Sequence, residues 1–94
     1  MAESSMDAVV RQMRDALIDN DLKILAAVNA RLTLAARLEA YARQNGREGL
    51  TPAREEWMLR YLEGANRGPI SADGLRELYE RLTDLTHREA LGDS

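Results

Sequence analysis

The feature that most constrains this chain is a long segment without a helix breaker. No glycine or proline occurs between Ala2 and Asn45. Apolar side chains within the segment recur at steps of three, four or seven residues, which is typical of one face of an α-helix. The members of this face are Met6, Val10, Met13, Leu17, Ile24, Val28, Ala35 and Leu38. We predict one helix from about Met6 to about Arg43, with residues 1–5 disordered.

A helix of this length does not fit inside a monomeric globule of this size. At about 1.5 Å per residue it extends roughly 55–60 Å, whereas a lone folded chain of 94 residues has a radius of gyration of about 12–13 Å. The helix must therefore find apolar cover beyond its own chain. A domain this small buries only a little over about 60% of its unfolded surface, so obligate dimerisation is one way to supply that cover.

A second, short helix follows the long one. Asn45 and Gly46 are expected to end the first helix, because glycine adopts the left-handed conformation at low cost. Thr51 is the expected N-cap of the second helix, with Pro52 at its first position. This helix is predicted to continue to about Asn66.

The third helix is of medium length and begins after the Gly68-Pro69 turn, with Ser71 as its N-cap. Its apolar face consists of Leu75, Leu78, Tyr79, Leu82 and Leu85. No internal repeat or low-complexity linker interrupts the chain. Residues 1–94 are therefore predicted to form one all-α domain of a long, a short and a medium helix.

The composition excludes several classes of function. The chain has no cysteine and one histidine, so disulfides, thiolate metal sites and histidine-based metal clusters are not expected. The net charge is −3, and the basic residues are interleaved with acidic ones, which argues against nucleic-acid binding. The N-terminus lacks the pattern of a secretion signal, and no run of about 18 apolar residues predicts a membrane span. We expect a soluble cytoplasmic domain.

Two arginines of the long helix raise the question of a binding site. Arg31 falls on the apolar face among Ala27, Val28 and Ala35. Its charge either extends into solvent or faces a ligand or a partner's carboxylate in the room that these small neighbours leave. Arg14 lies about 25 Å along the helix axis and about 100° around it from Arg31, so one chain cannot hold a small molecule with both. An antiparallel pair of such helices permits Arg14 of one subunit to approach Arg31 of the other.

The start of the second helix carries Arg54 and Glu55. A glutamate there is favoured by the helix dipole, whereas an arginine is mildly unfavourable and needs a partner. Taken alone, the sequence Thr-Pro-Ala-Arg-Glu-Glu is a weak functional signal.

The combination of these features is more specific. The chain has an arginine in the first turns of a long helix and a second arginine 17 residues later, at Arg14 and Arg31. A glycine-containing break, a P-x-R-E helix start at Pro52 and a Gly-Pro turn follow. From about Met6 to Ala90 this pattern resembles the all-helical type of chorismate mutase. The resemblance implies an intertwined homodimer of three-helix chains that converts chorismate to prephenate by a Claisen rearrangement, without metal or cofactor, in aromatic amino-acid biosynthesis.

The resemblance also implies roles for individual residues. Arg14 matches the arginine that the neighbouring subunit contributes, and Arg31 matches the main carboxylate clamp within the chain. Arg54 matches the arginine at the start of the second helix, and Glu55 the glutamate that accepts the substrate hydroxyl. Thr86 lies where the family often has a serine that contacts a carboxylate. Arg31, Arg54 and Glu55 are thus the expected catalytic residues, and Arg14, Arg31 and Thr86 the expected substrate-binding residues.

Three positions depart from the family pattern. Ala42 replaces the lysine and Ala90 the glutamine that donate to the ether oxygen, with Glu89 one position away from the latter. Thr51 replaces an aspartate. Losing one preorganised donor typically costs about 10²–10³ in rate. The resemblance therefore implies an enzyme that is weak or dependent on a partner.

Three explanations of these departures compete. A neighbouring arginine, Arg43, Arg47 or Arg60, replaces the missing lysine. Alternatively, a partner protein, such as the synthase that opens the aromatic pathway, completes the enzyme. Lastly, the chain has lost or changed its activity. It would then be a non-catalytic or regulatory dicarboxylate-binding module, or a related isochorismate-pyruvate lyase.

The remaining conspicuous side chains have plainer interpretations. His87 is next to the expected site on the third helix and is interpreted as a surface or dimer-edge histidine. Trp57, Tyr61 and Tyr79 are interpreted as packing residues of the core and the dimer.

Overall fold

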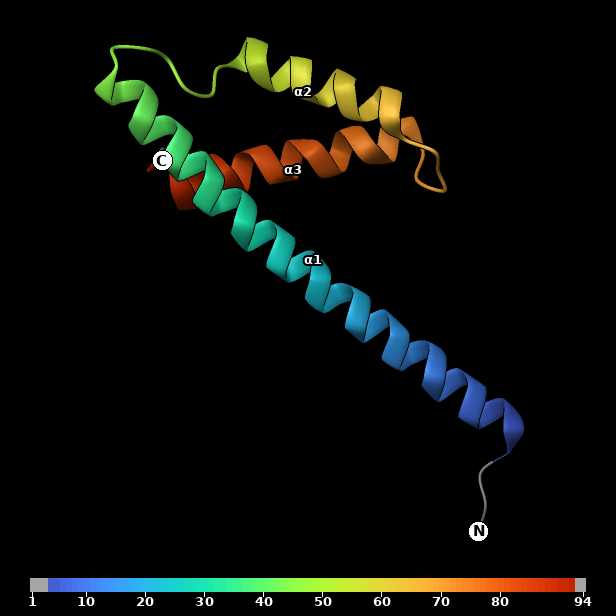
Figure 1. Ribbon diagram of the computed structural model, residues 1–94. Helices are drawn as coiled ribbons and strands as arrows, with labels where there is room; N and C mark the ends of the chain where they lie inside the picture. The colour runs from blue at the N-terminus through green and yellow to red at the C-terminus, as the bar shows by residue number, and fades with distance from the viewer. Residues whose placement is uncertain (1–3, 93–94) are drawn as a thin grey trace. The chain divides into compact units, whose positions relative to one another are not determined.

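The structure, a computed structural model, describes residues 4–92, which form three α-helices and no strand (Figure 1). The helices are α1 (Ser5–Gln44), α2 (Pro52–Ala65) and α3 (Ala72–Ala90). They confirm the predicted all-α class and the long, short, medium order, and every predicted end of α1 and α2 lies within one residue of the observed one. Residues 1–3 of the stretch expected to be disordered lie outside the described residues, and Ser5 is the first residue of α1.

Local sequence signals set the helix ends as predicted. Gly46 follows α1 with a φ of 64°, the left-handed conformation that glycine adopts without steric cost. At the start of α2, the hydroxyl of Thr51 accepts a hydrogen bond of 3.2 Å from the backbone N–H of Arg54. At the start of α3, the hydroxyl of Ser71 accepts a hydrogen bond of 3.0 Å from the N–H of Gly74. Both hydroxyls therefore satisfy backbone donors that have no partner within the helix.

The chain divides into two compact units, residues 1–30 and residues 31–94. The described part of the first unit is the N-terminal portion of α1. Its side chains are exposed except that of Val28, which is half-buried. The large apolar side chains exposed on this portion are Met6, Val9, Val10, Met13, Leu17, Ile18, Leu22, Ile24 and Leu25. Within its own unit, this helix thus lacks apolar cover.

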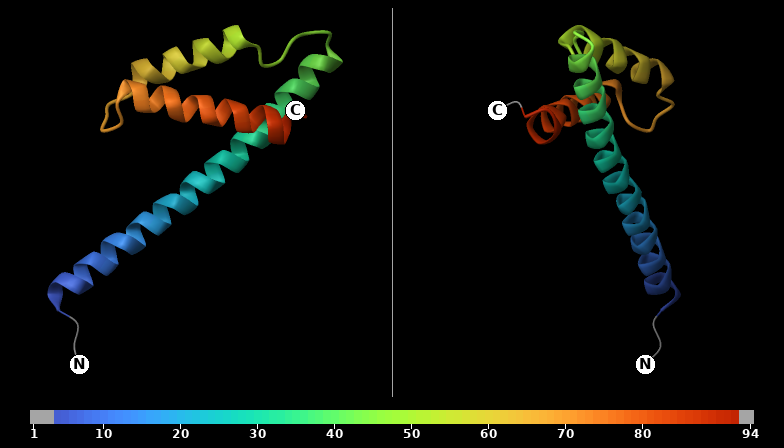
Figure 2. Two further views of the ribbon diagram at one scale, coloured as in Figure 1. Left: turned by 180° about the vertical axis from the view of Figure 1, so that it is seen from behind. Right: turned by 60° about the vertical axis from the view of Figure 1, so that its left-hand side comes forward.

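The second unit contains the C-terminal end of α1 together with α2 and α3. The helices α2 and α3 run antiparallel, side by side, and a short loop joins them (Figures 1 and 2). The buried side chains of the described residues are Ala35, Ala42, Leu59, Tyr79 and Thr86. Two of them lie on α1, one on α2 and two on α3, and α2 and α3 pack against each other.

The aromatic residues do not share one environment. Tyr79 belongs to the core, as predicted, with 5% of its surface exposed. Trp57 and Tyr61 are 65% and 66% exposed and stack on each other, with ring centroids 5.7 Å apart. These two rings therefore do not pack into the core of the second unit.

Candidate functional site

Arg31 is held against α3 by two contacts. Its guanidinium donates a hydrogen bond to the hydroxyl oxygen of Thr86, and its Cζ atom lies 5.5 Å from the centroid of the Tyr79 ring, within the range of a cation–π interaction. Thr86 is only 1% exposed, and its hydroxyl donates a 2.7 Å hydrogen bond to the carbonyl of Leu82. Because that hydroxyl donates in one direction and accepts in the other, it fixes the position of the guanidinium.

Tyr79 has a buried hydroxyl that forms no hydrogen bond with the described residues. Tyr79 lies seven residues before Thr86, so both side chains share one face of α3. Burial raises the pKa of the Tyr79 phenol, the charge of Arg31 and the approach of its side chain to the phenol oppose this shift, and the charge of Glu55 adds to it. The phenol therefore stays protonated at neutral pH, with its O–H donor unused.

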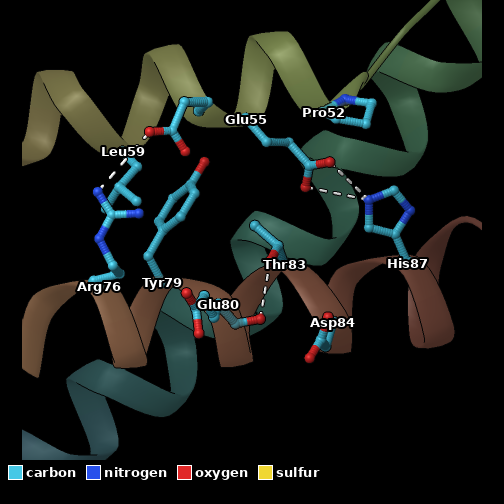
Figure 3. Close-up of a pocket in the computed structure, with 10 residues that line it drawn as sticks. Pro52, Glu55, Leu59, Arg76, Tyr79, Glu80, Thr83, Asp84 and His87 are labelled. Carbon is cyan, nitrogen blue, oxygen red and sulfur yellow. Dashed lines mark hydrogen bonds and ion pairs between the residues drawn. The ribbon is translucent and has the colours of Figure 1, made fainter.

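Glu55 and His87 form a pair between α2 and α3 (Figure 3). The Nε2 atom of His87 lies 3.0 Å from one carboxylate oxygen of Glu55 and 3.2 Å from the other. The side chains of Glu55 and His87 are 14% and 29% exposed. The two residues lie 32 positions apart in the sequence, and the packing of α2 on α3 brings them together.

A cavity of about 250 Å³ lies beside this pair (Figure 3). Glu55, His87 and Tyr79 line it, together with a ring of further charged side chains. These are Glu56, Arg76, Glu80 and Asp84. Arg76 is 3.9 Å from Glu56 and 3.5 Å from Glu63, so its charge is already directed at those two carboxylates.

Arg54 binds the loop that precedes its own helix. Its guanidinium donates to the backbone carbonyl of Glu48 and, at 2.7 Å, to that of Gly49. The same loop is fixed to α1, because a carboxylate oxygen of Glu39 accepts a 3.0 Å hydrogen bond from the N–H of Leu50. These bonds give Arg54 the partners that an arginine at a helix N-terminus needs.

Ala42 is 6% exposed and lines a larger cavity, of about 600 Å³, to which residues of this loop also contribute. Arg47 and Arg54 line the same cavity. Position 42, where the family has a lysine, therefore borders free volume and lies near the side chains of Arg47 and Arg54.

Two apolar hollows lie along α2, one beside Arg31 and one beside Arg54. The first, of about 260 Å³, is lined by Arg31, Trp57 and Met58 among others. The second, of about 330 Å³, is lined by Trp57, Met58 and Arg54. Trp57 and Met58 line both hollows, so the two hollows are neighbours on the surface of α2.

The predicted site residues thus fall into three groups. Arg31 contacts Thr86 and Tyr79, and Glu55 lines a cavity together with Tyr79. Arg54 lines the second apolar hollow. Arg14 belongs to the first unit, where it is exposed and 4.0 Å from Asp15. Over residues 4–92, no cluster of three histidine, aspartate or glutamate side chains has the arrangement of metal ligands.

The four candidate substitutes for the missing donors have different surroundings. Arg47 lines the cavity beside Ala42, whereas Arg43 is exposed at the end of α1 and does not line it. Arg60 pairs with Glu56 at 3.4 Å. Glu89 pairs with Arg88 at 3.7 Å, while Ala90 is half-buried.

Two residues of the candidate site, His87 and Tyr79, were not among the predicted site residues. His87 was interpreted as a surface or dimer-edge residue, yet it binds Glu55 across the α2–α3 interface. Its signal in the sequence was only that it directly follows Thr86. Tyr79 was correctly assigned to the core, but its spacing of seven residues from Thr86 also indicated that its hydroxyl lies on the site face of α3.

None of the three helices, within the part of the chain that the structure describes, contains an apolar stretch long enough to cross a membrane. A family model described as chorismate mutase type II matches residues 13–89. No curated protein and no solved structure matches the chain. The matched range contains Arg14, Arg31, Arg54, Glu55 and Thr86.

Proposed function

This chain belongs to the chorismate mutase type II family, and we propose that it converts chorismate to prephenate in the biosynthesis of aromatic amino acids. The observation that carries this proposal is the fixed guanidinium of Arg31 beside the buried hydroxyl of Thr86. Tyr79, which underlies Arg31, lines the same cavity as Glu55. A cation and a carboxylate acceptor in one region suit a substrate that carries two carboxylates and a hydroxyl.

In this reaction the protein forms no covalent bond with the substrate. One ether C–O bond breaks while one C–C bond forms within the same molecule, and no proton or electron is exchanged. The enzyme must hold the folded conformer and stabilise the negative charge that grows on the ether oxygen. We assign one substrate carboxylate to Arg31, whose planar fork matches carboxylate geometry, with Thr86 beside it. Glu55 accepts the substrate hydroxyl, and Arg54 contributes the second cation.

The two alanines that replace the usual ether-oxygen donors lead us to propose slow turnover. Of the candidate substitutes, we favour Arg47, because it lines the same cavity as Ala42 and Arg54. Arg60 and Glu89 are engaged by other side chains. A guanidinium reaching from Arg47 is less well fixed than a donor at position 42 itself would be, which costs preorganisation.

We further propose that the working unit is an intertwined homodimer. The support is the exposed apolar side chains of residues 4–30, which a second copy would cover. In such a dimer, Arg14 of one subunit completes the site of the other. A synthase of the aromatic pathway is a further candidate partner, one that would raise the low activity by ordering the site.

A second candidate function follows from Ala42 and Ala90. Neither side chain can donate a hydrogen bond, so the fold suits a non-catalytic or regulatory module that binds a dicarboxylate. A related isochorismate-pyruvate lyase, which eliminates pyruvate from isochorismate, has a similar site and is the third alternative.

The decisive experiment is an assay of the purified protein on chorismate, with and without a pathway synthase. We expect loss of chorismate absorbance with formation of prephenate. Arg31→Ala should lower kcat/KM by about 10²–10³, since a preorganised charged contact is removed. Arg37→Ala is the matched control, because Arg37 is an exposed arginine of the same helix that lines none of these cavities.

The alternatives give different results in the same assay. Chorismate binding without turnover above background would replace the enzyme with the binding module. Release of pyruvate from isochorismate would establish the lyase. In an active or inactive protein, Ala42→Lys combined with Ala90→Gln should raise the rate by about 10² or more if only the ether-oxygen donors are lacking. No gain would show that the defect lies elsewhere.

A further inference from the structure

We propose that His87 is a positioning residue that holds the Glu55 carboxylate in the orientation needed to accept the substrate hydroxyl. The inference rests on the proposed function, because Glu55 has this role only in a chorismate-binding site. The observation behind it is the placement of one imidazole nitrogen 3.0 Å and 3.2 Å from the two oxygens of Glu55 (Figure 3).

The geometry fixes the direction of the hydrogen bond. An ionised carboxylate only accepts hydrogen bonds, so the Nε2 atom of His87 must carry the proton that it donates. A single N–H between the two oxygens defines where the carboxylate lies and which way its plane faces. Each oxygen keeps further lone pairs, so Glu55 can still accept a hydroxyl proton from a ligand in the adjoining cavity.

The surroundings assign this task to His87 rather than to another base. Of the side chains that line the 250 Å³ cavity, the basic ones are Arg76 and His87. Arg76 is directed toward Glu56 and Glu63. The remaining charged groups of the lining, Glu80 and Asp84, are acidic and repel the Glu55 carboxylate. His87 is therefore the lining residue that attracts Glu55.

The pair of Glu55 and His87 also connects α2 to α3. Glu55 lies in the first turns of α2, and His87 lies in the last turns of α3, one position after the residue that binds Arg31. Consecutive residues of α3 thus hold the two groups that the proposed function assigns to opposite chemical parts of the substrate. Thr86 holds the cation that binds a carboxylate, and His87 holds the acceptor of the hydroxyl.

A double-mutant cycle tests the inference with chorismate as the probe. His87→Asn shortens the side chain so that its amide cannot reach Glu55, whereas His87→Gln places an N–H donor near the position of Nε2. We expect His87→Asn to lower kcat/KM by about tenfold, the size of effect for a hydrogen bond to a charged group, and His87→Gln to remain within about threefold of wild type. In a Glu55→Ala background, His87→Asn should change neither kcat/KM nor the chorismate Kd any further.

The possible results separate the inference from the proposed function. Equal losses for His87→Asn and His87→Gln, or a loss that persists in the Glu55→Ala background, would overturn the positioning role while leaving the mutase activity intact. A wild-type protein that neither binds nor converts chorismate would overturn the proposed function and the role of His87 together. Circular dichroism of each variant verifies that the helices are retained.

Discussion

At the level of single residues, Tyr79 carries a buried polar group that lowers the stability of the fold. Its hydroxyl is buried without a hydrogen-bond partner among residues 4–92, and such a group typically costs about 1–3 kcal/mol. We expect Tyr79→Phe to raise the free energy of unfolding by roughly 1 kcal/mol in the absence of ligand, measured by urea denaturation. A destabilised Phe variant would instead mean that the hydroxyl finds a partner, such as an ordered water or a second subunit.

The same residue predicts a dependence on pH. Burial raises the pKa of Tyr79 in the folded chain above its ordinary value of 10.0, against the opposing charge of Arg31. The folded state therefore holds this proton more tightly than the unfolded state. The free energy of unfolding therefore keeps its full value, as far as Tyr79 determines it, below pH 10. It declines as the pH rises through the folded pKa. Urea denaturation at a series of alkaline pH values should show this decline in wild type, and Tyr79→Phe should lessen it.

Residue types and spacings predicted candidate site residues but not the pairings between them. Arg31 and Thr86 were predicted from the family pattern, whereas their mutual hydrogen bond was not. His87 was interpreted as a surface or dimer-edge residue, because a lone histidine in an amphipathic helix carries no sign of its partner. Its contact with Glu55 depends on how α2 lies on α3, and this packing is encoded by no local signal.

The loop between α1 and α2 depends on a glycine for its close approach to α1. A Cβ atom at Gly49 would lie 2.1 Å from a carboxylate oxygen of Glu39 and 3.2 Å from its Cα atom. Gly49→Ala would therefore displace the carboxylate that binds the N–H of Leu50. We expect a loss of about 1 kcal/mol in the free energy of unfolding, measured by urea denaturation at fixed protein concentration.

Gly64→Ala is the matched control for Gly49→Ala. Gly64 lies within α2, and an added Cβ there meets no atom within 4 Å. Alanine should stabilise this helix by about 0.5–1 kcal/mol. If Gly49→Ala leaves the unfolding midpoint unchanged or raises it, as Gly64→Ala should, the proposed clash at Gly49 is wrong.

Helix ends were the elements that the sequence predicted best. Gly46, Thr51 and Ser71 act through contacts within a few residues, so their effects are visible in a short stretch of sequence. The apolar periodicity of α1 was also informative, but it did not specify what covers that face. Local rules define the helices, and the covering partner is a matter of longer-range packing.

At the scale of the whole molecule, exposed apolar surface outweighs the core. Only five described side chains are buried, whereas nine large apolar side chains of residues 4–30 are exposed. A core so small gives little stability on its own. In the proposed homodimer, therefore, thermal unfolding should depend on protein concentration.

A charge on the apolar face of α1 tests this assembly directly. Leu17 is 64% exposed, and Leu17→Glu should abolish the dimer in sedimentation and lower the thermal midpoint. Gln12→Glu adds the same charge about 140° around the helix and should leave both unchanged. A wild-type chain that sediments as a stable monomer would contradict the dimer.

The exposed face of α1 also has a kinetic consequence. If a second copy supplies its cover, the chain completes its fold only on colliding with another chain. Refolding from denaturant would then include a second-order step, whose half-time halves when the protein concentration doubles. Newly made chains would await this encounter with their apolar helix open to chaperones and proteases, so the amount of functional protein would rise more steeply than its rate of synthesis.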